Sequence, residues 1–462
     1  MTALAPGMDQ DSKDVVPTTT AARMSGQYEQ LNTSEEPQYR VYKRRFFGLI
    51  QLILLNIAVS WAWLSFSAVS TTSSEFFQVS ESAINWLSTG FLFAFLIASP
   101  ATLYVLNKYP PKIAIVTSSV LVLVGNWLRY AGARAGPRGN FPLVIFGQVI
   151  IGLAQPFVLA SPTRYSDAWF SSTGRVSATA IASLANPLGG ALGQLIGPSW
   201  TTKPSQIPSL ILYVGIISTI ASVPSFFLPS LPPTPPSPSS TSRPTLPLRR
   251  ALALLLRNPQ FHLLSLPFAT YVGFFNASSS LINQFLAPHG FSEDDAGIAG
   301  ALLIGVGLVA SAIVSPVVDR TKAYLLTIKT LVPLIAVAYL ILVFAPGTRS
   351  LAAVCVTMAL IGGASFSLLP CALEYMVELT WPVSPEVSSV VSWAGGQLLG
   401  AVFILVMDAL RDGWKGEPVG SMKRALVFQA VLAWVVLPLV LLLGIGKQGK
   451  EVGRRERGTT EG

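Results

Sequence analysis

The sequence predicts an all-α membrane protein of about twelve transmembrane helices arranged in two six-helix halves. The 462 residues are 51% hydrophobic and only 11% charged, with a mean hydropathy of +0.55, which is too apolar for a soluble protein of this length. Lysine and arginine gather in short segments between apolar runs. These runs continue for about twenty residues, the helix length that crosses about 30 Å of hydrocarbon, whereas barrel strands alternate over about ten.

Apolar runs, bounded by Pro, Gly and charged residues, define the spans. The six spans predicted in the first half are 46–69, 84–106, 113–133, 141–160, 176–196 and 209–228. The six predicted in the second half are 261–286, 296–318, 325–344, 351–377, 387–410 and 425–445.

A segment crowded with Pro, Ser and Thr, Pro229 to Pro247, separates the two sets of spans and cannot be helical. Six helices on each side of an irregular linker is the plan of the major facilitator fold, in which a solute site forms near the bilayer midplane between two halves. The predicted domains are a disordered cytoplasmic tail at 1–40, a half at 41–228, a cytoplasmic linker at 229–257, a half at 258–446 and a basic cytoplasmic tail at 447–462.

Basic residues predict the orientation of the chain, because cytoplasmic loops carry an excess of lysine and arginine. With both termini cytoplasmic, most basic segments fall on that side: Lys43 to Arg45, Lys108 with Lys112, Arg164 with Arg175, Arg249 and Arg250 with Arg257, Arg320 and Lys322 with Lys329, and Lys447 to Arg457. The opposite side carries the acidic patch Glu293 to Asp295, with Arg134 and Arg138 as exceptions. Long spans favour the plasma membrane over an internal membrane.

Several function classes are excluded by what the chain contains. The net charge of +9 is explained by the topology, so we expect no nucleic-acid partner. Cys355 and Cys371 lie inside apolar runs, and His262 and His289 lack the spacing of a metal or heme pair. No phosphate-binding loop and no nucleophile triad is visible. We therefore expect no enzymatic activity, no cofactor and no metal, and a monomer whose partners are a small solute and the bilayer.

The first span contains an aromatic and hydroxyl cluster around Trp61 and Trp63. The two indoles point about 200° apart on a helix, so only one can face a central cavity. Both could be interfacial belt residues, but Trp63 lies deep enough to offer a π face to a cation. In the fourth span Gln155 precedes Pro156, and its amide binds either the carbonyl freed by the proline kink or a solute.

Polar residues also open the second half, which indicates a cavity shared between equivalent helices. The candidates for substrate binding in this seventh span are Asn276, Asn283 and Gln284. Charged residues near the predicted cytoplasmic ends of spans are candidates for gating or coupling: Arg164, Asp319, Arg320, Glu374 and Glu378. The two glutamates are either proton carriers or partners of Arg320 and Arg164, and an ion-pair gate is favoured.

Several short motifs, in order from about 40 to 410, resemble the feline leukemia virus subgroup C receptor family of major facilitator transporters. They are Lys43-Arg44-Arg45-Phe46, Ile84-Asn85-Trp86-Leu87-Ser88, Ala154-Gln155-Pro156-Phe157, Pro162-Thr163-Arg164, Trp169-Phe170, Leu281-Ile282-Asn283-Gln284 and Glu378-Leu379-Thr380-Trp381-Pro382-Val383-Ser384. The resemblance implies facilitative transport of choline and related amines, with heme as a long-proposed cargo.

The same resemblance implies an aromatic cage, in which Trp63 matches the first-span Trp and Gln155 the fourth-span Gln. Asn276 stands where the family has a seventh-span Tyr, which leaves room for a different amine or a neutral polar solute. The family gate after the eighth span is kept at Asp319 and Arg320, while Asn107 replaces the acidic residue of the matching gate after the second span.

The sequence therefore predicts a secondary transporter or uniporter of a small organic solute, choline or a related amine, working by alternating access. Proton coupling through Glu374 is the alternative mechanism. Heme transport is a further alternative, although His262 and His289 offer it no physical support. A receptor or sensor on the same fold, without solute turnover, is the alternative from a different class.

Overall fold

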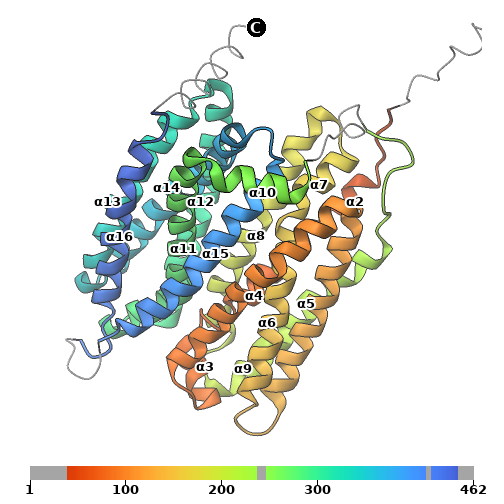
Figure 1. The fold of residues 1–462 in the computed structure, drawn as a ribbon. Helices are drawn as coiled ribbons and strands as arrows, with labels where there is room; N and C mark the ends of the chain where they lie inside the picture. The colour runs from red at the N-terminus through yellow and green to blue at the C-terminus, as the bar shows by residue number, and fades with distance from the viewer. Residues whose placement is uncertain (1–38, 237–245, 413–417, 446–462) are drawn as a thin grey trace, which may run out of the picture.

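The computed structural model describes residues 39–236, 246–412 and 418–445, and the described part is helical without strands (Figure 1). The predicted tails lie outside the described residues except for positions 39 and 40. Within the predicted linker, residues 237–245 are also outside, whereas Leu248–Arg257 form the helix α10.

The first half is built from six long helices, one of them followed directly by the short helix α7, and from the short helix α3. They are α2 (Arg45–Leu64), α3 (Ser70–Phe77), α4 (Glu81–Lys108), α5 (Pro111–Arg134), α6 (Phe141–Leu159), α7 (Ser161–Trp169), α8 (Ser172–Trp200) and α9 (Ile207–Ser222).

The second half contains six long helices after α10. They are α11 (Pro259–Leu286), α12 (Glu293–Thr321), α13 (Tyr324–Phe344), α14 (Leu351–Thr380), α15 (Pro385–Ala409) and α16 (Lys423–Leu441). The helices match the predicted spans within a few residues at most ends, and the first span is the exception described below.

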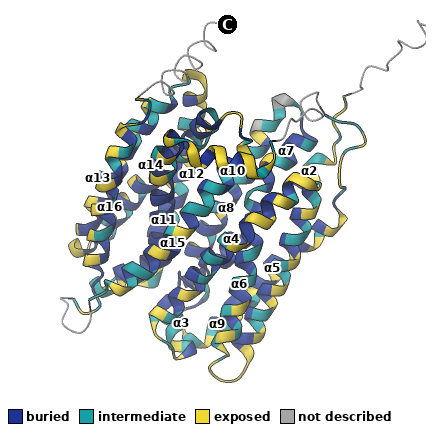
Figure 2. Cartoon of the chain, in the orientation of Figure 1, coloured by how far each residue is buried: buried dark blue, intermediate teal, exposed yellow. Residues whose placement is uncertain are grey.

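Ten of the twelve long helices, in some cases counted with the short helix that adjoins them, are long and apolar enough to cross a membrane, and α8 and α11 are the two that are not. These two are 29 and 28 residues long, so they are too polar rather than too short. Most residues of α11 are buried, which fits a helix that polar side chains keep inside the protein (Figure 2). The polar helix α11 thus lies in the interior of the bundle.

The two halves meet along two pairs of helices, α4 with α15 and α8 with α12. At the second contact Gly297 faces the backbone of α8, since a Cβ added there would lie 2.5 Å from the carbonyl oxygen of Gln194. Small residues allow helices to approach this closely in a membrane.

The bundle has two distinct ends (Figure 1). We call the one that carries α7 and α10 the linker end and the opposite one the α3 end. The helix α10 lies across the bundle at the linker end, with Ala251 and Leu255 buried and its arginines exposed.

Candidate functional site

The first predicted span, 46–69, is not one continuous helix. The helix α2 ends at Leu64, residues 65–69 form turns, and α3 begins at Ser70. The carbonyl of Ala62, in the last turn of α2, accepts hydrogen bonds from the Ser65 hydroxyl (2.9 Å) and from Arg129 Nη1 (3.1 Å). These side-chain donors replace the backbone donors that a continuing helix would supply, which explains why the prediction of an unbroken helix is wrong here.

The two tryptophans of α2 lie against different helices, as their spacing predicts. Trp61 stacks on Trp200 of α8, with ring centroids 5.9 Å apart, and Trp63 stacks on Phe91 of α4 at the same distance. Trp63 is 4% exposed, and its indole N–H has no hydrogen-bond partner within the described residues. A buried N–H donor without a partner costs free energy. A polar group that accepts a hydrogen bond from the Trp63 indole would recover this free energy.

Gln155 lies on α6, directly before Pro156, and is also 4% exposed. Its amide oxygen is buried and accepts no hydrogen bond from any described residue. The first half therefore presents one unsatisfied acceptor and one unsatisfied donor at its two candidate residues.

Asn276 of α11 is held within the second half. Its Nδ2 donates to Oε1 of Gln397 on α15 (3.1 Å), and its side chain packs against Gly400, where an added Cβ would lie 2.8 Å from Nδ2. Both amide side chains are buried. Tyr271 does not take the place of the missing family Tyr, because its hydroxyl donates to the carbonyl of Ala433 on α16 (3.2 Å).

Asn283 and Gln284 lie near the α3 end of α11, in bonds that join the two halves. Asn283 Nδ2 donates to Ser70 Oγ (3.0 Å), Thr71 Oγ1 (3.2 Å) and Glu293 Oε1 (3.1 Å). The Glu293 carboxylate also accepts the backbone N–H groups of Thr71 (3.0 Å) and Thr72 (3.1 Å) and the Thr72 hydroxyl (2.7 Å). A carboxylate from the second half thus caps the N-terminus of α3 in the first, where helix N–H groups favour an anion.

Gln284 and Asn85 of α4 exchange two hydrogen bonds, of 2.6 and 3.1 Å. Asn85 Nδ2 also donates to Asp408 Oδ1 (3.0 Å). Arg411 donates to Gln284 Oε1 (3.0 Å) and forms an ion pair with Glu81 (2.6 Å). We call the residues in these bonds and those around Glu293 the inter-half latch: Ser70, Thr71, Thr72, Glu81, Asn85, Asn283, Gln284, Glu293, Asp408 and Arg411.

The predicted gating residues lie near the linker end, on α7, α12 and α14. Arg164 is 3.9 Å from Asp167 on α7, and the same carboxylate pairs with Arg175 of α8 at 2.9 Å. In the second half the Tyr324 hydroxyl donates to Asp319 (3.2 Å). Glu374 interacts electrostatically with Asp319 and Lys322. Arg320 is exposed, and Glu378 lies one turn beyond Glu374 on α14.

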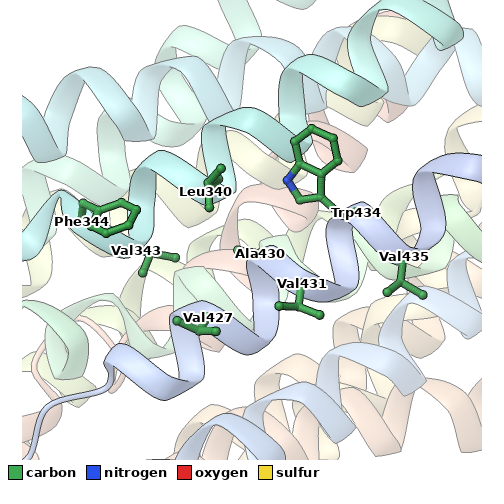
Figure 3. Close-up of a pocket in the computed structure, with 8 residues that line it drawn as sticks. All are labelled: Leu340, Val343, Phe344, Val427, Ala430, Val431, Trp434 and Val435. Atoms are coloured by element: carbon green, nitrogen blue, oxygen red, sulfur yellow. The ribbon is translucent and has the colours of Figure 1, made fainter.

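A groove of about 430 Å³ lies between α13 and α16 (Figure 3). Of the eight side chains that line it, only Trp434 carries a polar atom. An apolar groove on two peripheral helices cannot orient a hydrophilic solute, so it is not the candidate site.

Sequence reasoning missed several polar residues that the structure places in the interior or in bonds between the two halves. Arg129, alone in the middle of an apolar run, is a signal that could have been read, because intramembrane charges are expensive. Gln397 could have been noticed for a similar reason, because it is a polar residue inside an apolar run. Glu81, Asp408 and Arg411 lie at span ends, where charges are common, so only the three-dimensional arrangement shows their pairing.

Comparisons with known proteins agree with this architecture. The profile of the Major Facilitator Superfamily matches residues 51–404. A solved D-xylose-proton symporter has the same fold, with a TM-score of 0.62 and 14% identity over 84% of this chain and 97% of its own. Proteins of this fold and family are transporters, so the prediction that the chain is not an enzyme is confirmed.

Two curated relatives refine the assignment. Solute carrier family 49 member A3 of Danio rerio is 31% identical over 419 residues, covering 88% of this chain and 86% of the relative. A choline/ethanolamine transporter of Danio rerio is 26% identical over 392 residues, covering 82% and 80%. The chain is a multi-pass secondary transporter of small solutes, and it belongs to the Major Facilitator Superfamily, in the feline leukemia virus subgroup C receptor family that its motifs resemble.

Proposed function

We propose that this protein carries a small amine, of the ethanolamine or choline type, by facilitated alternating access. The observation that carries the proposal is the unsatisfied amide oxygen of Gln155, buried in α6. An ammonium N–H satisfies such an oxygen with a charge-assisted hydrogen bond. The choline/ethanolamine transporters among its relatives support the same substrate class.

Trp63 and Asn276 complete the proposed site from the two halves. The Trp63 ring offers a π face to the cation, and the Asn276–Gln397 pair offers amide dipoles from the second half. Because an amide pair stands where the family has a Tyr, the site favours an amine with N–H donors over a quaternary ammonium, which has none.

The inter-half latch is the proposed gate on the extracellular side. Basic residues at the linker end, such as Lys43, Arg44 and Arg249, favour a cytoplasmic location for that end and for both termini. Opening toward the α3 end requires the bonds of Asn283, Gln284 and Glu293 to break together. We therefore assign Asn283 and Gln284 to gating rather than to solute contact. We propose that the protein acts as a monomer in the plasma membrane.

Proton coupling through Glu374 remains the second candidate because this carboxylate on α14 and Asp319 on α12 both lie near the linker ends of their helices. Two neighbouring carboxylates do not both ionise easily, so one can carry a proton. Glu374→Gln separates the mechanisms: pH-independent uptake by the variant beside pH-dependent uptake by the wild type supports coupling. Equal pH profiles of uptake for Glu374→Gln and the wild type would contradict proton coupling through Glu374.

The test of the proposed substrate is uptake of labelled ethanolamine and choline into proteoliposomes with a negative-inside potential. Trp63→Ala should abolish saturable uptake. Trp434→Ala, a tryptophan of the peripheral groove, is the matched control and should leave uptake unchanged. Saturable uptake by the folded wild type is expected, and its absence for both amines would refute the substrate class.

A further inference from the structure

Arg129 of α5 is fully buried in a helix that crosses the membrane, and the first span breaks beside it. We propose that Arg129 is a positioning residue whose guanidinium caps the carboxyl end of α2, fixes the point where the first span breaks and holds Trp63 in place. The link to Trp63 rests on the proposed function, in which this indole contacts the solute.

Apart from a hydrogen bond to Asn126 Oδ1 on its own helix (3.4 Å), the contacts of Arg129 converge on the end of the neighbouring helix α2. Nη1 donates to the carbonyl of Ala62 (3.1 Å), and Nη2 donates to the hydroxyl of Ser65, the first residue after α2. The guanidinium carbon also lies 4.7 Å from the centre of the Phe66 ring. The planar fork of an arginine holds two acceptors in one fixed geometry, whereas the ammonium of a lysine is a compact point charge with rotatable donors.

The charge of Arg129 is balanced by a helix end rather than by an acid. Within the described part of the chain, no aspartate or glutamate forms an ion pair with it. The carboxyl end of a helix carries about half a negative charge on its free carbonyls. A cation inside the membrane is stabilised by backbone carbonyls, and the broken helix gains the donors that it lacks.

The neighbouring helix α6 is shaped around this arginine. A Cβ added to Gly147 would lie 2.6 Å from the carbonyl oxygen of Gly125 and 2.9 Å from Cγ of Arg129, so a larger residue there would push α6 away from α5 at the arginine. One residue further, Gln148 Nε2 donates to the carbonyls of Ala62 (3.4 Å) and Trp63 (3.3 Å). Two buried donors from two helices therefore share the carbonyl of Ala62, and Gln148 also holds the carbonyl of Trp63.

The position of Trp63 follows from this arrangement. Its carbonyl is held by Gln148, and its ring stacks on Phe91 of α4 within 15° of parallel. Residues 65–69 beyond the cap form turns and lead into α3, whose N-terminus belongs to the inter-half latch. Arg129 thus lies between the proposed solute residue and the proposed gate.

Hydrogen–deuterium exchange of residues 58–72 in the purified full-length protein tests the cap without any transport assay. In Arg129→Gln, amides around residues 62–70 should exchange about tenfold faster than in the wild type, because a buried charged hydrogen bond is lost. Gln51→Leu is the matched control: Gln51 also ties α2 to the first half, through Ser225 (2.6 Å) and Ala221, but at the opposite end of the helix. It should leave exchange at 62–70 unchanged.

A second readout is ethanolamine uptake, for which Arg129→Gln should raise KM more than it lowers the maximal rate. Unchanged exchange at 62–70 in Arg129→Gln, or equal loosening there in Gln51→Leu, would overturn the cap. If Arg129→Gln does not fold, Arg129→Lys undergoes the same exchange measurement: faster exchange at 62–70 supports the cap, and unchanged exchange overturns it. If the wild type moves no amine, the proposed substrate is wrong, and exchange still decides the role of Arg129.

Discussion

The proposed solute site and the inter-half latch are both polar, but they differ in how their polar atoms are satisfied. In the latch, Glu293 accepts four hydrogen bonds and Arg411 binds both Glu81 and Gln284. At the site, the amide oxygen of Gln155 and the indole N–H of Trp63 have no partner among the described residues.

This difference fits the two roles proposed above, solute binding for the site and gating for the inter-half latch. A buried polar group without a partner loses about 1–3 kcal/mol, which a bound solute can recover. Most polar atoms of the latch are paired, Asn283 Oδ1 and Arg411 Nε being exceptions, and its many bonds across the two halves resist separation. The structure therefore joins the two halves by hydrogen bonds at the α3 end and leaves Gln155 Oε1 and the Trp63 indole N–H without a partner among the described residues.

The largest effect is expected from Glu293→Ala, which removes the acceptor that caps α3 from the other half. Loss of these bonds should favour opening of the α3 end by about 2 kcal/mol, or about 30-fold. The measurement is maleimide labelling from the α3 side of a cysteine introduced by Ser280→Cys, in a Cys355→Ser, Cys371→Ser background. A labelling rate equal to that of the parent protein would show that the latch does not hold this end closed.

The next largest effect is expected at the proposed solute site. Gln155→Leu should raise the KM for ethanolamine about tenfold, because the ammonium loses a charge-assisted hydrogen bond. Choline has no N–H donor, so its KM should change much less. Competition between the two labelled amines in one proteoliposome preparation measures this directly. An equal loss for both amines would mean that Gln155 acts through packing.

A smaller effect is expected from Arg411→Gln, since the ion pair with Glu81 is partly exposed, at 22% for each side chain. Solvent screening limits such a pair to about 1 kcal/mol, or about fivefold in labelling at position 280. Arg424→Gln is the control, because its pair with Asp412 involves an arginine that is 75% exposed. Equal effects of the two substitutions on the labelling rate would show that Arg411 does not help to hold the α3 end closed.

The smallest effect concerns pH near the α3 end. Burial, and then the charge of Arg349, lower the pKa of His289 below its usual 6.5. The unfolded chain therefore binds more protons than the folded one as pH falls below about 6.5, and stability decreases there. Between pH 7.5 and 5.5, His289→Gln should lose about 1 °C less in Tm than the wild type. A larger loss in the variant would reverse the sign of this contribution.

The sequence alone predicted the fold class because hydrophobic length and basic-residue placement are properties of single segments. The polar character of α11 and the opposed directions of Trp61 and Trp63 were also visible, since they follow from helical periodicity. The break after Leu64 was not, because it depends on Arg129 and Gln148, which reach it from α5 and α6.

The latch could not be predicted for the same reason. Asn283 and Gln284 look like pore residues on their own helix, and only the approach of Asn85, Arg411 and α3 shows that they join the halves. Asn276 was found from the family motif, but its partner Gln397 comes from a helix more than a hundred residues later.

The most direct test of alternating access is to lock the latch reversibly. Asn85→Cys and Gln284→Cys, in the Cys355→Ser, Cys371→Ser background, place two thiols where the structure has a reciprocal amide pair. A short bis-methanethiosulfonate cross-linker should stop ethanolamine uptake, dithiothreitol should restore it, and each single-cysteine variant should be unaffected by cross-linking. Full uptake by the cross-linked protein would contradict the account, because transport would then proceed without opening the α3 end.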